Sequence, residues 1–147
     1  MKKNILCIYG SSTGNTEKLI NGIKVNSIIK NHNINVINSA TIKDVFVIEK
    51  KWDLVILSSS TWGIMPPCLQ EDFENFWKFL DKSSISANKF LIMGLGDKYY
   101  PHFAYAVDFL VENILKYNGI VLDYLKIQEN WENNQKEIYY WINNLQF

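Results

Sequence analysis

Apolar residues fall into two alternating patterns along this chain. Runs rich in apolar residues predict β-strands at Ile5–Tyr9, Asn35–Asn38, Leu54–Ser59, Phe90–Gly94 and Val121–Ile127. Three of these runs are continuous rather than alternating, which is typical of strands in a parallel sheet that is covered on both faces. The strand pattern therefore favours a buried parallel sheet.

Between the strands, apolar residues recur at helical spacing. The first helix is expected to begin at Glu17, and a weaker pattern indicates a second helix near Thr41–Ile48. Three further helices carry apolar faces, in chain order Phe73, Phe76, Trp77 and Leu80; Phe103, Val107, Leu110 and Ile114; and Ile138, Trp141, Ile142 and Leu145. Asn118-Gly119 predicts the end of the second of these three helices.

This alternation predicts a single α/β domain over residues 1–147, with a doubly wound, five-stranded parallel sheet and helices on both faces. Ligands of such sheets bind beyond the carboxyl ends of the strands. The loops after the first, third and fourth strands are therefore expected to form one site. These are also the three loops with unusual sequences.

Composition narrows the possible functions. The 147 residues are 48% hydrophobic, which is enough for one core, and no apolar run approaches the roughly 20 residues that span a bilayer. The 15 basic residues, all lysines, balance 15 acidic ones, so neither nucleic acid nor a membrane is an expected partner. Two isolated cysteines and an N-terminal apolar run too short for a signal peptide indicate the cytoplasm.

The loop Ser11-Ser12-Thr13-Gly14-Asn15-Thr16 predicts an anion site at a helix N-terminus. The first N–H groups of a helix lack intrahelical partners, and the helix dipole places partial positive charge there. The loop adds hydroxyl donors, but it has neither the lysine of a Walker A loop nor the spacing of a dinucleotide-binding G-x-G-x-x-G. It therefore favours a mononucleotide phosphate held by neutral donors.

The other two loops add aromatic residues. In Ser60-Thr61-Trp62-Gly63, the indole of Trp62 is either a wall for a flat ligand or a hydrophobic plug over the sheet. The loop from Gly94 to Phe103 offers a second wall or an ordinary glycine turn with surface tyrosines. Together with a phosphate cradle, the two loops favour a planar ring with a phosphate tail. FMN fits better than an adenine nucleotide, because a metal carboxylate and a cation for a polyphosphate are lacking.

With these three loops the chain resembles the flavodoxin family from end to end. The segment Leu125-Lys126-Ile127 and the following helix with Trp141 are also similar to the end of family members. The fifth strand leaves no room for a long insertion, so the resemblance is to the short-chain type. It implies the strand order 2-1-3-4-5 and a monomer.

Position by position, the resemblance implies an FMN site with a phosphate part and a ring part, and no catalytic or metal-binding residue. The phosphate part comprises Ser11, Ser12, Thr13, Gly14, Asn15, Thr16 and Ser60. The ring part comprises Thr61, Trp62, Gly63, Gly96, Asp97, Tyr100, His102, Phe103 and Ala104, with Trp62 and Tyr100 on the two ring faces. The Gly63 carbonyl would turn to accept a hydrogen bond from N5–H of the one-electron-reduced flavin.

The resemblance further implies a low-potential one-electron carrier rather than an enzyme, cycling mainly between the neutral semiquinone and the hydroquinone of FMN. Its partners would be redox proteins, with a flavodoxin or ferredoxin reductase as donor. The chain departs from the family in its zero net charge, and Ile64-Met65-Pro66-Pro67 stands where some members have acidic residues. We therefore predict a less negative second potential than is usual.

Other functions are weighed against this one. A phosphoacceptor receiver domain shares the strand order but needs an acidic cluster after the first strand, where Tyr9-Gly10-Ser11 stands. Two alternatives stay open: an FMN protein dedicated to one biosynthetic pathway, and a small quinone-reductase-like flavoenzyme.

Overall fold

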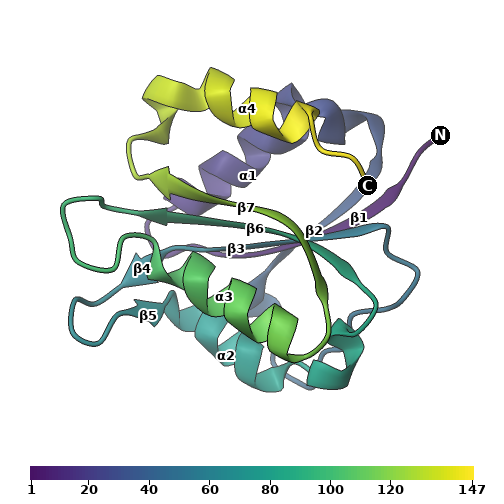
Figure 1. The fold of residues 1–147 in the computed structure, drawn as a ribbon, viewed down its shortest axis with the longest axis horizontal. Coiled ribbons are helices and arrows are strands. Elements are labelled where there is room, and N and C mark those ends of the chain that lie inside the picture. Colours follow the sequence, from purple (N-terminus) through teal and green to yellow (C-terminus); the bar gives the residue numbers. More distant parts are fainter.

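The computed structural model describes residues Met1–Phe147. Its five-stranded sheet has the order β2-β1-β3-β6-β7 (Figure 1). The strands are β1 Asn4–Gly10, β2 Asn33–Asn38, β3 Leu54–Ser59, β6 Lys89–Gly96 and β7 Ile120–Gln128. All neighbouring strands pair in parallel. Counted along the chain this is the order 2-1-3-4-5, so the predicted fold class is confirmed.

Helices cover both faces of the sheet, as predicted (Figure 1). Helices α1 Asn15–Asn26 and α4 Gln135–Asn143 lie on one face, and α2 Glu71–Phe79 and α3 Tyr105–Lys116 lie on the other. Short 3-10 helices are η1 Ile28–Asn31, η2 Ser39–Thr41, η3 Lys82–Ile85 and η4 Trp131–Asn134. No helix is both long and apolar enough to cross a membrane.

The continuous apolar strands supply both cores, because successive side chains point to opposite faces of a sheet. In β1, Leu6 and Ile8 pack into the core beneath α2 and α3. Their neighbours Ile5 and Cys7 pack into the second core, which α1 and α4 cover. Runs that would be too apolar for a half-exposed strand are thus explained by burial on both faces.

The helix predicted near Thr41–Ile48 is wrong. The structure forms only η2 there, and then an extended segment in which Phe46 makes a parallel bridge with Leu80. Burial alternates along this segment: Ile48 is 1% exposed, whereas Val45 and Val47 are 75% and 52% exposed. This period of two and the β-branched valines favour extended backbone, and they outweigh the weak helical spacing.

A second, two-stranded sheet was not predicted. Strand β4 (Thr61–Trp62) pairs antiparallel with β5 (Cys68–Leu69), and a turn containing Gly63 joins them. The backbone N–H of Ala106, in the first turn of α3, donates to Thr61 Oγ1 at 2.8 Å. The loop after β3 is therefore a hairpin that is tied to the neighbouring helix.

Candidate cofactor site

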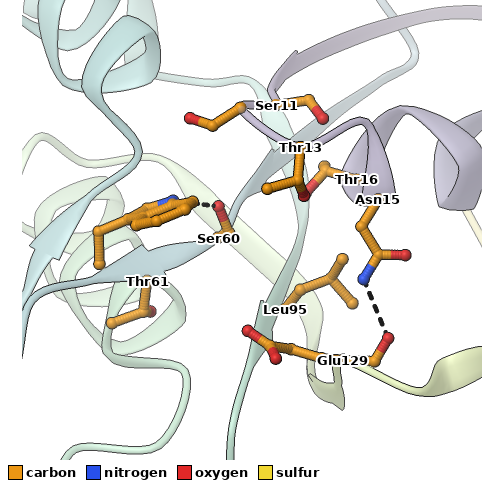
Figure 2. Close-up of a pocket in the computed structure, with 10 residues that line it drawn as sticks. Ser11, Thr13, Asn15, Thr16, Ser60, Thr61, Leu95 and Glu129 are labelled. Atoms are coloured by element: carbon orange, nitrogen blue, oxygen red, sulfur yellow. Dashed lines mark hydrogen bonds between the residues drawn. The ribbon is translucent and has the colours of Figure 1, made fainter.

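A pocket of about 190 Å³ lies at the carboxyl ends of the strands (Figure 2). Ten residues line it: Ser11, Ser12, Thr13, Asn15, Thr16, Ser60, Thr61, Trp62, Leu95 and Glu129. The first eight of these were predicted as site residues. The fold thus brings the loop after β1 and the loop after β3 together, as expected for the edge of a doubly wound sheet.

The phosphate-loop geometry follows from one glycine. Gly14 has φ +88°, a left-handed conformation, and α1 begins directly after it at Asn15, two residues before the predicted start. The Oγ of Ser11 accepts hydrogen bonds from the N–H groups of Gly14 at 3.1 Å and Glu17 at 3.4 Å. The N–H groups of Asn15 and Thr16 have no acceptor within the protein. These two donors are at the N-terminus of α1, where the helix dipole favours an anion, and both residues line the pocket.

Three serine hydroxyls that line the pocket each keep a hydrogen that a ligand can accept. Each oxygen already accepts a hydrogen bond: Ser11 from Gly14 and Ser12 from Gln70 Nε2 at 2.9 Å. Ser60 accepts from Trp62 Nε1 at 2.8 Å, the bond dashed at Ser60 in Figure 2. A hydroxyl whose oxygen accepts within the protein still carries one hydrogen to donate. The donor set therefore fits a phosphate group that is bound by neutral hydrogen-bond donors.

Trp62 lies at the mouth of this pocket and is not a plug. Trp62 is 43% exposed, and the hydrogen bond from its indole N–H to Ser60 Oγ fixes the ring. The next residue, Gly63, has φ +72°, and a Cβ there would lie 2.9 Å from the Pro66 carbonyl oxygen. The hairpin thus presents an aromatic wall beside a residue position that favours glycine.

Several predicted residues do not line the pocket. They are Gly14, Gly63, Gly96, Asp97, Tyr100, His102, Phe103 and Ala104. Tyr100 is 55% exposed, in the loop between β6 and α3, which Figure 1 shows extending beyond the strand ends. The structure therefore places one aromatic wall at the pocket and leaves the second in the adjoining loop.

The loop between β6 and α3 has a defined backbone. Asp97 Oδ1 accepts from the Tyr99 N–H, and Gln128 Oε1 accepts from the Lys98 N–H, both at 2.9 Å. A Cβ at Gly96 would lie 2.8 Å from the nitrogen of Ala104, which itself has φ +49°. The left-handed Ala104 also explains why α3 begins at Tyr105 and not at Phe103, where the apolar pattern begins.

Two lining residues, Leu95 and Glu129, were not predicted from the sequence. Glu129 is the only charged residue that lines the pocket. Its backbone is held on both sides: its N–H donates to the Gly96 carbonyl at 3.0 Å, and its carbonyl accepts from Asn15 Nδ2 at 2.9 Å (Figure 2). Asn15 Oδ1 in turn accepts from Trp131 Nε1 at 3.0 Å. The signal that could have found Glu129 is its position directly after the fifth strand.

Titratable groups around the site form no metal centre. No group of three or more His, Cys, Asp or Glu side chains is arranged to hold a metal ion. Near the pocket, burial is the main cause that raises the pKa of Tyr9, at the end of β1, with Glu17 adding to the rise. The neutral phenol of Tyr9 is therefore retained to higher pH than usual.

The fold and the pocket define an open, doubly wound α/β protein whose anion-binding loop lies at the carboxyl ends of the strands. The profile of the flavodoxin family matches residues 7–141, and the chain belongs to this family. It is 33% identical over 137 residues to the flavodoxin of Maridesulfovibrio salexigens, an alignment that covers 92% of each chain.

Solved structures share the fold of this chain. Oxidised flavodoxin 1 from Bacillus cereus superposes with a TM-score of 0.71 at 26% identity, over 97% of this chain and 99% of the other. A Fusobacterium nucleatum flavodoxin mutant bound to FMN gives 0.77 at 18% identity, over 97% and 94%. Because β7 is continuous from Ile120 to Gln128, the chain is of the short-chain type. As a flavodoxin, the chain is an FMN-binding electron carrier. The alternative of a quinone-reductase-like flavoenzyme is therefore excluded.

Proposed function

We propose that this chain binds FMN with its phosphate at the N-terminus of α1 and its ring beside Trp62, and that it passes single electrons between redox proteins. The observation that carries the proposal is the donor set of the pocket. Ser11, Ser12 and Ser60 each accept a bond inside the protein and keep a hydrogen for the ligand. The free N–H groups of Asn15 and Thr16 add to these donors.

For the ring part we propose the predicted residues, with Trp62 and Tyr100 on its two faces. FMN supplies the redox chemistry, and the protein selects among its states. Gly63 has the backbone freedom to present its carbonyl to a proton on the reduced ring, because it already occupies a left-handed conformation. The chain would then operate mainly between its one-electron-reduced and fully reduced forms.

The charges around the site support a second potential that is less negative than is usual in the family. The segment Ile64-Met65-Pro66-Pro67 carries no charge, so it does not oppose negative charge on the reduced ring. Glu129 is the single carboxylate at the pocket wall. With Asp97 of the proposed ring part, the site has two carboxylates, which disfavour the fully reduced state less than a larger acidic cluster would.

Partner docking is proposed to depend on apolar contact around the same loops. Ile64, Met65 and Tyr99 are 51%, 83% and 83% exposed. We infer redox-protein partners, with a reductase of the flavodoxin or ferredoxin type as donor, and weak dependence of docking on salt. We also infer one monomeric domain in the cytoplasm; its two cysteines are free thiols, which fits a reducing compartment.

Stepwise reduction tests the function. The protein is loaded with FMN and titrated with dithionite under argon, and absorbance is followed through both electrons. We expect long-wavelength absorbance of a neutral one-electron-reduced form at about half reduction. Direct two-electron bleaching, or absence of FMN binding, would contradict the proposal.

Ring contacts are tested by affinity. The substitutions Trp62→Ala and Tyr100→Ala should each weaken FMN binding by about five- to 150-fold, because a stacked ring contributes roughly 1–3 kcal/mol. Tyr140→Ala is the matched control, since Tyr140 is 72% exposed on α4 and lies outside the pocket. Equal FMN affinities in all three variants would refute the assignment of the ring faces.

A further inference from the structure

Gln70 lies between the two parts of the pocket without lining it. The residue is 1% exposed and is the N-cap of α2. Its backbone N–H donates to the Ser60 carbonyl at 3.0 Å and to Ser59 Oγ at 3.1 Å. Its side-chain Nε2 donates to Ser12 Oγ at 2.9 Å and to Asp72 Oδ2 at 3.1 Å. One buried residue therefore bonds to both pocket loops.

The orientation of the Gln70 amide is determined by its neighbours. Oε1 accepts from the Phe73 N–H at 3.0 Å, which caps α2. Nε2 must then face Ser12, so Gln70 donates and the Ser12 oxygen accepts. The Ser12 hydroxyl hydrogen is left for the pocket, where the phosphate cradle lies. Gln70 thus sets Ser12 as a donor to an anion.

The backbone hydrogen bond from Gln70 to the Ser60 carbonyl connects Gln70 to the ring part. Ser60, whose carbonyl accepts from the Gln70 N–H, immediately precedes β4, which carries Trp62. The Oγ of the same serine accepts from the Trp62 indole. A shift of Gln70 would therefore move both a phosphate donor and the support of the aromatic wall. Gly10, at the end of β1, leaves the space that the Gln70 amide occupies, because a Cβ there would lie 2.3 Å from Gln70 Oε1.

We propose that Gln70 is a positioning residue that couples the phosphate part of the pocket to its ring part. The inference rests on the proposed function. An anion bound at Ser12 orders the hydroxyl that Gln70 holds, and Gln70 transmits this order to Ser60 and Trp62, so that the ring binds more tightly. Occupation of the ring part strengthens anion binding by the same factor, because coupling between two sites is reciprocal.

The two halves of FMN can be supplied separately. Riboflavin carries the ring without the phosphate, and inorganic phosphate occupies the cradle alone. The dissociation constant of riboflavin is measured by flavin fluorescence quenching, with and without saturating phosphate at constant ionic strength. We expect phosphate to tighten riboflavin binding about fivefold in the unsubstituted protein, the factor that one hydrogen bond of about 1 kcal/mol supplies.

The coupling ratio is the dissociation constant of riboflavin without phosphate divided by that with phosphate. The substitution Gln70→Met keeps a side chain of similar length but removes its hydrogen bonds, so it should bring this ratio close to one. Ser12→Ala removes the same bond from the exposed side without touching the cap of α2. It should lower the ratio to a similar value, and the double variant should lower it no further. If Gln70→Met does not fold, Ser12→Ala decides the question by itself.

Asn88→Ala is the control for a loss of stability alone. Asn88 is 2% exposed and donates to the Ser84 carbonyl at 2.7 Å. It lies immediately before β6, at the end of the strands opposite to the pocket. Asn88→Ala should lower the free energy of unfolding and leave the ratio of the riboflavin dissociation constants without and with phosphate unchanged.

The coupling is refuted if phosphate does not strengthen riboflavin binding in the unsubstituted protein, or if the ratio persists in Gln70→Met or, where that variant does not fold, in Ser12→Ala. Binding of intact FMN by the unsubstituted protein tests the proposed function independently. A protein that binds FMN but shows no coupling therefore overturns only the role of Gln70.

Discussion

Asn15 joins the first turn of α1 to the segment after β7. Its side chain donates to the Glu129 carbonyl at 2.9 Å and accepts from Trp131 Nε1 at 3.0 Å. These bonds link residues more than 110 positions apart. Trp131 is 5% exposed, so its indole N–H has little access to water. Asn15 therefore holds the α1 end of the pocket against the wall that carries Glu129.

The substitution Asn15→Ala removes both bonds. At about 1 kcal/mol each, with a further penalty for a buried donor left without a partner, the free energy of unfolding should fall by about 2–3 kcal/mol. For a chain of this length, that corresponds to a melting temperature lowered by roughly 4–12 °C. Urea unfolding of the FMN-free protein, followed by far-UV circular dichroism, measures the loss.

Asn15→Asp separates stability from binding. The carboxylate still accepts from Trp131 and is favoured at a helix N-terminus, so it should cost only about 1 kcal/mol of stability or less. It also adds a second negative charge beside Glu129, so FMN should bind more weakly than to Asn15→Ala, with a difference that shrinks as salt is added.

Asn21→Ala is the control for these variants, because Asn21 is exposed on the same helix; its free energy of unfolding should change by less than about 0.5 kcal/mol. An unfolding midpoint of Asn15→Ala equal to that of Asn21→Ala would refute the reasoning.

Three further results are expected. Burial raises the pKa of the Cys7 thiol from 9.0 to about 12, so between these pH values only the unfolded chain loses this proton. The free energy of unfolding should therefore fall by up to about 1.4 kcal/mol per pH unit in this range, and it should fall less steeply in Cys7→Val. Urea unfolding at several pH values measures this, and parallel curves of free energy against pH for the two proteins would contradict it. Gly96→Ala should cost about 1–3 kcal/mol in urea unfolding, because its methyl group meets the Ala104 backbone; an unchanged midpoint would exclude the clash. Potentiometric titration should give a second one-electron potential less negative than that of an acidic flavodoxin measured alongside, and an equal or lower value would disprove the charge argument.

The strand and helix order was predictable because it depends on local patterns. The continuous runs of β1, β3 and β6 predict strands that are buried on both faces, and the structure confirms them within two residues. The prediction failed at 41–48, where the helical spacing is weak and the contacts of Phe46 with Leu80 decide the conformation. Such contacts join residues far apart in the chain, so local spacing does not report them.

The class of fold and the composition of the phosphate loop follow from local sequence, because hydroxyls and a glycine at a strand-to-helix junction have the same chemistry in any parallel sheet. Which of these polar atoms already have a partner depends on the folded structure. It alone shows that Ser12 accepts from Gln70, that Asn15 is held by Trp131, and that Glu129 completes the wall. The physical reason is that a hydroxyl or an amide has several possible partners. The packing of distant segments selects one of them, and that choice determines which hydrogens remain for a ligand.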